Sequence, residues 1–346
     1  MPKRKIKQFI PLIIFVVVIA AAVFSLVYKG KSIEIGSGNE FLSPSAANTP
    51  EIKKSPISGL SCENGDRRPV AVMLSGDAIT RPLSGLARAD LILEMPVITG
   101  GINRFMTIYV CGDPTEIGSV RSARDDFIPL AKGWDAIYAH WGGSHFALDE
   151  LRSGVIDNLD ALVNPFEAFY RKSGIAMPHN GFTSAARLLN ASQKKGYRLE
   201  SNLAAYPHLE NFQPATTTAK TLIVAYPGAF QVKYQYDAAS NSYLRWRGGT
   251  KETDKILKTQ LAPKNVVIMR APSRQIEGQY NDVQVEGQGA VAIYRNGEEI
   301  KGTWKKSASN QKDRLSFFDE KGREIEFVPG QIWIQVVEPR EQITYE

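Results

Sequence analysis

The longest hydrophobic stretch of the chain is residues 9–28, which read FIPLIIFVVVIAAAVFSLVY and contain no charged residue. Because an α-helix rises about 1.5 Å per residue, a stretch of this length spans the roughly 30 Å hydrocarbon core of a bilayer. Basic residues flank it on both sides, and the positive-inside rule leaves residues 1–8 in the cytoplasm. We therefore predict a transmembrane signal anchor, with the rest of the chain outside the membrane.

Residues 9–28 have two other interpretations. A cleaved signal peptide has a shorter apolar core of about 7–15 residues and a small-residue cleavage site, whereas this stretch ends in VYKGKS. The first cysteine is Cys62, too far away to accept a lipid. A buried core helix is disfavoured by the length and the basic flanks.

Beyond the anchor, the pattern of apolar positions predicts a linker and then a mixed domain. Residues 29–56 are rich in Ser, Gly, Pro, Asn and Lys without an apolar period, which predicts a flexible linker. Strand-length apolar runs then alternate with helical ones over residues 57–215, which predicts an α/β domain with a central sheet. The expected strands are 67–74, 89–96, 105–111 and 136–140, and the expected helices are 127–132, 144–153 and 184–195.

The pattern changes after residue 217, where short strand-like runs separated by Gly, Asn and Asp predict a smaller, mostly-β domain over residues 218–340. Asn296-Gly297 predicts a two-residue hairpin turn. The aromatic residues on these strands fit core packing or a glycan-stacking platform. The expected strands are 220–225, 230–236, 243–247, 265–270, 289–294, 302–305, 325–328 and 332–337. The fold class expected for the chain is α+β.

The charge of the chain supports the membrane topology. The formal net charge is +6, from 42 basic and 36 acidic residues, and such a balance can indicate a nucleic-acid partner. Six of the basic residues flank the hydrophobic stretch, so positions 32–346 carry 36 of each sign. We therefore expect a membrane partner and no nucleic acid. The six residues are Lys3, Arg4, Lys5, Lys7, Lys29 and Lys31.

Cys62 and Cys111 are the two cysteines of the chain. An extracytoplasmic location permits a disulfide between them, if adjacent strand ends bring their Cα atoms to the ~5.5 Å that a bridge requires. Two independent thiols are the alternative. A metal site is disfavoured because no CxxC or CxxH spacing accompanies them.

Polar loops at the predicted strand ends contain four arginines, Arg81, Arg104, Arg121 and Arg124. A guanidinium binds carboxylate or phosphate through two parallel hydrogen bonds, so their convergence would form a cationic pocket. Two acidic residues, Glu94 and Asp125, could balance it. The alternative for each arginine is a salt-bridged surface position.

Histidines supply the remaining candidate chemistry. His140 ends a predicted strand, and Ser144 can cap the next helix, whose first N–H groups could hold an anion. His140 fits a general acid or base, an anion donor or a structural residue. His179-Asn180 fits a turn or a site. No HxH, HExxH, Walker or GxSxG motif occurs, so we expect neither a metal nor another cofactor.

Several motifs together resemble one family. RRPVAVML, RPLSGLARADLILE, GGINRF, IGSVRSAR, WDAIYAHWGGS and MPHNGFTS occur in this order, followed by GQGAVAIYRNGEEIKGTW and GREIEFVPGQIWIQVV. Over residues 57–340 the chain resembles the YerB-like lipoproteins of bacteria. The resemblance implies a two-domain extracytoplasmic protein but brings no activity. It carries over candidate positions Arg81, Glu94, Arg104, Arg121, Arg124, His140 and Asn180.

The chain departs from this family in two respects. It has a spanning stretch instead of a lipidated cysteine, and it reads Ser75-Gly76-Asp77 where the family more often has Asn or Asp-Asn. Three hypotheses remain open. The first is an envelope protein of the bacterial cytoplasmic membrane that binds an anionic cell-wall component or an envelope partner through its arginine-rich loops. The second is a hydrolase or transferase on a phosphorylated or glycan substrate that uses His140. The third is an assembly factor.

Overall fold

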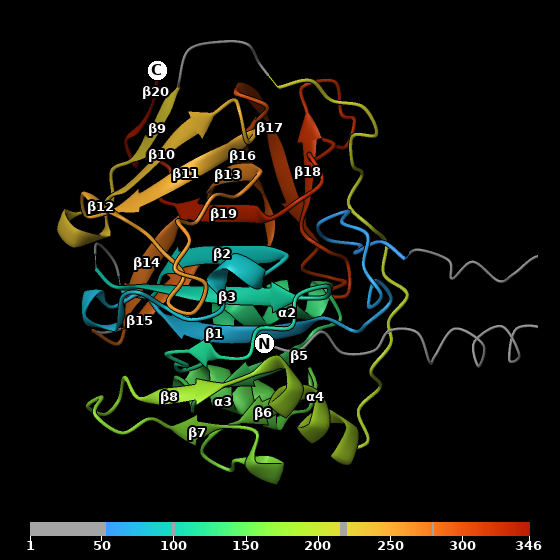
Figure 1. Cartoon of the computed structure of the whole chain (residues 1–346), viewed down its shortest axis with the longest axis vertical. Helices are drawn as coiled ribbons and strands as arrows, with labels where there is room; N and C mark the ends of the chain where they lie inside the picture. The colour runs from blue at the N-terminus through green and yellow to red at the C-terminus, as the bar shows by residue number, and fades with distance from the viewer. Residues whose placement is uncertain (1–52, 99–100, 215–219, 279) are drawn as a thin grey trace, which may run out of the picture. The chain divides into compact units, whose positions relative to one another are not determined.

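A mixed ten-stranded sheet runs through the part of the chain that this computed structural model describes, residues 53–98, 101–214, 220–278 and 280–346 (Figure 1). The order along the sheet is β18-β17-β16-β13-β19-β2-β3-β1-β5-β6. Five strands come from the first half of the chain: β1 (Val70–Ser75), β2 (Leu91–Pro96), β3 (Asn103–Tyr109), β5 (Ile137–His140) and β6 (Asn158–Asp160). Five come from the second half: β13 (Asn265–Arg270), β16 (Gly287–Arg295), β17 (Glu298–Lys306), β18 (Ser316–Asp319) and β19 (Ile332–Val337).

The two halves join where β19 lies between β2 and β13, parallel to both. The central sheet expected for residues 57–215 therefore continues into the second half of the chain. The predicted anchor, residues 9–28, lies outside the described residues. Among the described residues, no helix has the length and apolarity needed to cross a bilayer.

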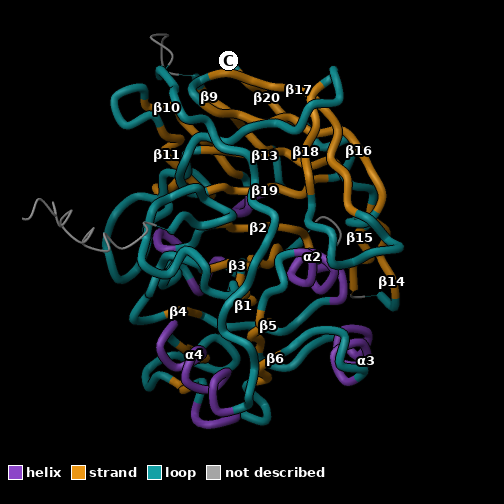
Figure 2. Tube along the Cα trace, turned by 90° about the vertical axis from the view of Figure 1, so that its right-hand side faces the viewer, coloured by secondary structure: helices purple, strands orange, loops and turns teal. Residues whose placement is uncertain are grey.

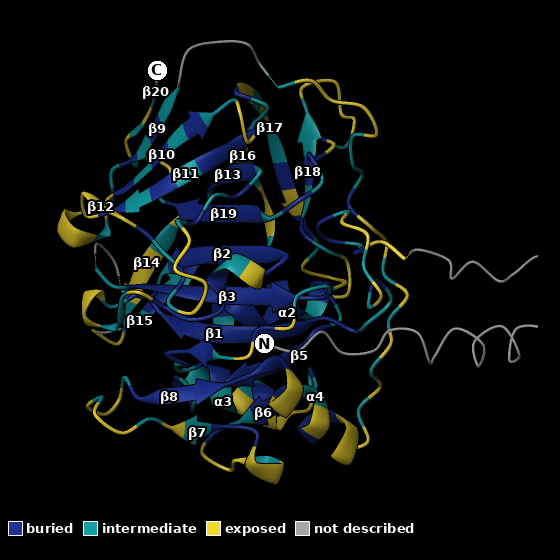
Figure 3. Cartoon of the chain, viewed as in Figure 1, coloured by how far each residue is buried: buried dark blue, intermediate teal, exposed yellow. Residues whose placement is uncertain are grey.

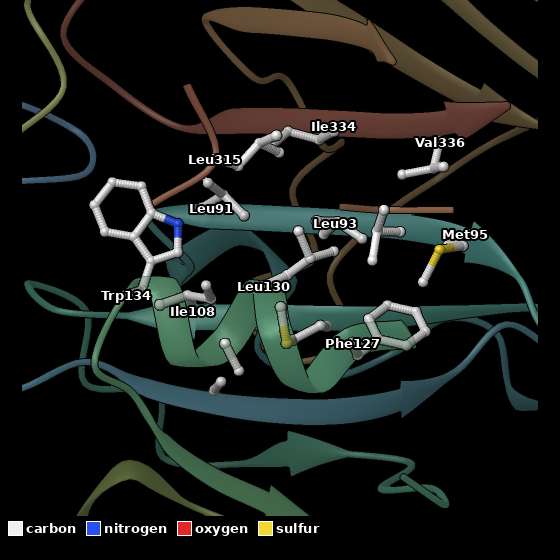
Figure 4. Packing of buried hydrophobic residues seen from close by; sticks show 14 of the residues in the cluster. Leu91, Leu93, Met95, Ile108, Phe127, Leu130, Trp134, Leu315, Ile334 and Val336 are labelled. Atoms are coloured by element: carbon white, nitrogen blue, oxygen red, sulfur yellow. The ribbon is translucent and has the colours of Figure 1, made fainter. Parts of the chain in front are cut away.

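One face of the ten-stranded sheet is covered by α2 (Ile128–Gly133), as Figure 4 shows. Leu130 of this helix and Trp134 after it belong to one buried cluster with Leu91, Leu93 and Ile108 of the sheet. Five of the six residues of α2 are buried (Ile128, Pro129, Leu130, Ala131 and Gly133), so this short helix lies inside the core. The short α3 (His145–Arg152) follows β5.

The opposite face packs against a second, antiparallel sheet and against α4 (Ala185–Lys194). Figure 2 shows the strands of this second sheet together at one end of the molecule and the helices toward the other. Its five strands are β12 (Thr250–Lys251), β11 (Ser242–Arg247), β10 (Val232–Asp237), β9 (Thr221–Val224) and β20 (Ile343–Tyr345). The smaller sheets comprise β4 (Ile117–Gly118), β7 (Tyr170–Arg171), β8 (Gly181–Thr183), β14 (Ser273–Ile276) and β15 (Tyr280–Val283). The 3₁₀ turns are Ala78–Thr80, Leu86–Arg88, Asp125–Phe127, Pro165–Glu167 and Gly228–Phe230.

The central strands are buried along their whole length because both faces of the sheet are covered (Figure 3). Such strands are continuous apolar runs and do not alternate apolar with polar residues. The segments VAVML in β1 and IWIQVV in β19 are mostly apolar runs of this kind, which is why the sequence predicts both strands.

The mixed class with a large central sheet and smaller β structure agrees with the α+β expectation. The hairpin at Asn296-Gly297 is confirmed: both residues have positive φ, +52° and +75°, and β16 pairs with β17. The strand predicted for residues 325–328 is wrong, because Phe327 makes a single bridge to His208.

The aromatic side chains predicted on the strands of the second half lie in the core. Trp304, Trp333, Tyr294 and Phe327 are each at most 1% exposed, which excludes a glycan-stacking platform at these positions.

Cys62 and Cys111 form a disulfide that joins the segment before β1 to the end of β3, with 5.7 Å between the Cα atoms. The two cysteines are separated by 49 residues in sequence. A bridge restricts the unfolded chain more strongly as the closed loop becomes longer, and a loop of this size corresponds to about 4 kcal/mol in the chain-entropy treatment.

We predict that the double variant Cys62→Ser/Cys111→Ser loses about 2–4 kcal/mol of unfolding free energy, measured by denaturant titration of the oxidised proteins. The wild-type protein should react with a thiol reagent only after reduction. Free thiols in the unreduced protein, or equal stability of the two proteins, would contradict the bridge.

Candidate functional site

Three arginines and one aspartate meet at one edge of the central sheet, and we call Arg104, Arg121, Arg124 and Asp77 the arginine cluster. Asp77 follows β1, Arg104 lies on β3, and Arg121 and Arg124 follow β4. Oδ2 of Asp77 accepts a hydrogen bond from Nη2 of Arg121 at 3.1 Å and lies 3.8 Å from Nη1 of Arg104. One carboxylate therefore serves two guanidinium groups.

The topology of the sheet brings these residues together. β1 and β5 run parallel, and β3 is antiparallel to β1, so the end of β1 and the start of β3 lie at the same edge. In α/β sheets, loops at the carboxyl ends of parallel strands form the usual ligand site. Gly76 permits the close approach, because a Cβ atom there would lie 2.2 Å from the carbonyl oxygen of Asn103.

Some N–H groups of the arginine cluster donate no hydrogen bond to any described residue. Nε of Arg104, of Arg121 and of Arg124 is buried without a partner among these residues. Arg104 is only 6% exposed, and within the described part of the chain the one hydrogen bond of its side chain is a 3.4 Å contact from Nη1 to the carbonyl of Asn103. Arg121 and Arg124 each donate to one further backbone carbonyl.

The three positive charges of the cluster repel one another, and Asp77 offsets part of this repulsion. Burial, reinforced by the positive charge of Arg121, lowers the pKa of Arg104 to about 9. Burial also lowers the pKa of Arg124. For Asp77, burial acts in the opposite direction but is outweighed by the Ser75 hydrogen bond and the two arginines, so its pKa is lowered. An additional anion would relieve this excess of positive charge.

Two residues of this site, Asp77 and His179, were not among the predicted ligand-binding positions. Nδ1 of His179 lies 3.9 Å from Oδ2 of Asp77 and has no hydrogen-bond partner among the described residues. The placement of Asp77 directly after a buried strand was the signal that could have identified it. His179 is brought to the site by Pro178, whose carbonyl accepts from Arg121 Nη1 at 3.3 Å.

His140 lies in the protein interior and not at an accessible surface. It is 1% exposed, and its ring nitrogens lie 2.9 Å from the carbonyl of Gly142 and 3.3 Å from Oδ1 of Asn158. Among the three roles left open for it, these contacts match the structural one. Ser144 is the N-cap of α3, accepting from the N–H of Ala147.

Asp125 and Asn180 lie beside the arginine cluster. Oδ1 of Asp125 accepts from the Ser144 hydroxyl at 3.2 Å, and its negative charge acts on neighbouring Arg124. Asp125 also lines an acidic cavity of about 500 Å³. Asn180 is buried and accepts a 2.6 Å hydrogen bond from Arg171, whose guanidinium stacks on Trp141.

Glu94 does not belong to this site. It is completely buried between the two larger sheets, where Oε2 pairs with Nη2 of Arg245 at 2.7 Å and Oε1 with Nη2 of Arg247 at 2.5 Å. Glu252 pairs with both arginines from the other side. Asn103 and Gln335 donate further hydrogen bonds to Glu94. The expectation that Glu94 balances the predicted arginine pocket is therefore wrong, since its partners are arginines of β11.

Arg81 is also separated from the arginine cluster. Its Nη1 donates to the carbonyl of Ala229 at 2.8 Å and its Nη2 to the carbonyl of Gly76 at 3.1 Å. The structure thus brings three of the four predicted arginines together and directs Arg81 toward the second sheet.

Comparison with known proteins assigns a family to this fold and site. Residues 57–198 match the N-terminal domain of DUF3048, described as a protein of unknown function, and residues 222–334 match the C-terminal domain of the same family. The chain belongs to the DUF3048 family.

A relative within this family is "Putative lipoprotein YerB" of Bacillus subtilis. It is 31% identical over 291 residues, which cover 82% of this chain and 86% of that protein. The crystal structure of Bacillus subtilis YerB matches with a TM-score of 0.76 at 29% identity, covering 85% of this chain and 99% of that one. The YerB-like resemblance inferred from the motifs is confirmed.

The buried Glu94 predicts a specific pH dependence of stability. Burial alone would raise its pKa, but Arg247, Arg245 and their hydrogen bonds outweigh burial and lower it from 4.5 to about 2. The stabilisation from a lowered carboxyl pKa is present above the unfolded value and is lost as the pH falls toward the folded value. A shift of this size corresponds to roughly 3 kcal/mol.

We predict that Glu94→Gln lowers the unfolding free energy by roughly 3 kcal/mol at neutral pH, and that this deficit shrinks as the pH falls from about 4.5 to about 2. Denaturant titration at several pH values measures it. The exposed control Glu320→Gln should stay within about 0.5 kcal/mol of wild type. A deficit that is independent of pH would contradict the account.

Proposed function

We propose that this protein is a membrane-anchored extracytoplasmic protein that binds an anionic group in the arginine cluster. The observation that supports the site is Arg104. The residue is 6% exposed, and within the described part of the chain its guanidinium makes one 3.4 Å hydrogen bond, has Asp77 at 3.8 Å and leaves Nε without a partner. An unsatisfied buried donor costs about 1–3 kcal/mol, and more when it is charged. Such an arrangement is costly for stability alone and is suited to a ligand that supplies the missing acceptors.

A phosphate group is the anion that this arrangement favours. The three guanidinium groups come from β3 and from two positions after β4, so their donors approach from several directions. A phosphate offers oxygens in a tetrahedral arrangement, whereas a carboxylate offers two in one plane. Phosphorylated cell-wall components outside the membrane have this chemistry.

An enzymatic role that uses His140 gains no support from its surroundings, since the ring is buried and both nitrogens have oxygen partners. We therefore favour binding over catalysis. His179, which faces Asp77 at the edge of the cluster, would position the ligand or Asp77.

The extracytoplasmic location rests on two observations. The YerB relative is named a lipoprotein, which suggests association with the outer face of a membrane. This chain has a disulfide, typical of oxidising compartments. We propose that residues 9–28 form its single-pass anchor, with residues 1–8 inside, residues 29–56 as linker and the two family domains outside.

We predict that the full-length protein in detergent binds pyrophosphate and that Arg104→Gln weakens this binding about tenfold or more, measured by titration calorimetry. Arg121→Gln should act in the same direction. The exposed control Arg340→Gln should bind as wild type does.

The same variants separate a ligand site from a structural ion pair. Because Nε of Arg104 has no partner among the described residues, we expect Arg104→Gln to leave the ligand-free protein at least as stable as wild type. A loss of thermal stability together with unchanged pyrophosphate affinity would show a purely structural role and reject the site.

We predict that the full-length protein remains in the membrane fraction of bacterial cells after an alkaline wash, and that deletion of residues 9–28 abolishes this association. Intact-mass measurement should show an uncleaved N-terminus. A mature chain that begins after residue 28, or a full-length protein in the soluble fraction, would contradict the anchor.

A further inference from the structure

A cavity of about 360 Å³ lies on the other side of the loop that carries Asp77. It is lined by Ala78, Arg81 and Pro82 of that loop, by Ala229 before β10, and by residues between the end of β11 and Thr253. Figure 1 shows the loop after β1 and the short β12 on the same side of the molecule. The cavity is distinct from the arginine cluster, because Arg104, Arg121 and Arg124 do not line it.

Arg81 forms one wall of this cavity in a fixed orientation. Two of its nitrogens donate to the carbonyls of Ala229 and Gly76, and its guanidinium lies over the ring of Phe230, 5.5 Å from the centroid. Its Nε is buried without a partner among the described residues. The side chain is thus held in place, and each Nη atom carries a second N–H beyond the one that it donates to a carbonyl.

Arg247 and Glu252 lie at the floor. Arg247 is 3% exposed; Nη2 is held by Glu94, while Nη1 has only a 3.4 Å contact to the carbonyl of Phe230. Glu252 is committed to Arg245 and Arg247. Both acids act electrostatically on Arg81, but neither forms an ion pair with it among the described residues, because their oxygens pair with Arg245 and Arg247.

The electrostatics leave one uncompensated positive charge. Glu94 and Glu252 balance Arg245 and Arg247 within the network, and Arg81 adds a further charge. Burial, and next the positive charge of Arg247, lower the pKa of Arg81 to about 10. The exposed Lys251 adds more positive charge at the mouth.

We propose that this cavity is a second anion site, which takes a small carboxylate whose oxygens accept from Arg81 and Arg247. The negative charge of a carboxylate would offset the positive charge that Arg81 and Lys251 add to this cavity. Ala78, Pro82 and Ala229 provide apolar wall for the carbon part of such a molecule. This site is additional to the phosphate site proposed for the arginine cluster and does not depend on it.

A fluorinated carboxylate tests the proposal without interference from detergent. Trifluoropropionate is titrated with the full-length protein and followed by the ¹⁹F line width. We expect saturable binding to wild type and to Arg340→Gln, and a loss of about tenfold or more in affinity in Arg81→Gln. Arg81→Lys keeps the positive charge but lacks the paired N–H groups of a guanidinium. Its affinity for trifluoropropionate should therefore lie between those of wild type and Arg81→Gln.

A second variant, Ala229→Trp, fills the mouth from an exposed position while leaving Arg81 in place, and should also block binding. No binding to wild type, or equal affinity in Arg81→Gln, would overturn the proposal. If Arg104→Gln abolished binding of trifluoropropionate while Arg81→Gln did not, the probe would occupy the arginine cluster. The second site would then be rejected and the proposed function retained.

Discussion

The carboxylate of Glu94 is the charge on which the packing of the two larger sheets depends. It lies on β2, opposite Gln335 of β19 in the register of the central sheet, and receives Arg245 and Arg247 from β11 of the second sheet. A buried carboxylate without partners destabilises a protein by several kcal/mol. Separating or shifting β2, β19 or β11 would remove partners of Glu94 and so destabilise the fold by about that amount. Glu252 completes the network by balancing the second arginine charge.

The same sheet edge carries the two cationic sites. Glu94, Arg245 and Arg247 satisfy one another in the interior, whereas Arg104 lies nearby with donors that no described residue accepts. The loop after β1 separates the two environments, with Asp77 directed to one and Arg81 to the other. In our proposal, this single short loop contributes to two anion sites.

The local pattern was sufficient to predict the central strands, the helix caps and the grouping of Arg104, Arg121 and Arg124 at strand ends. It was not sufficient for Glu94, whose partners are about 150 residues away in sequence and on another sheet. In the sequence, Arg81 is as good a ligand-binding candidate as the other three arginines, because its loop also follows a strand. Only the contacts of Arg81 with Ala229 and Phe230, in the turn before β10, distinguish it. The continuation of the sheet through β19 was likewise a long-range pairing that no local signal shows.

Crystals of the full-length protein soaked with tungstate would test the central claim most directly, because tungstate mimics phosphate and its anomalous scattering marks its position. The account predicts a tungstate ion within hydrogen-bond distance of Arg104 and Arg121, whose guanidinium groups are not fully paired by the residues that the structure describes. The account would be contradicted if the arginine cluster excluded the ion and protein atoms satisfied the guanidinium groups.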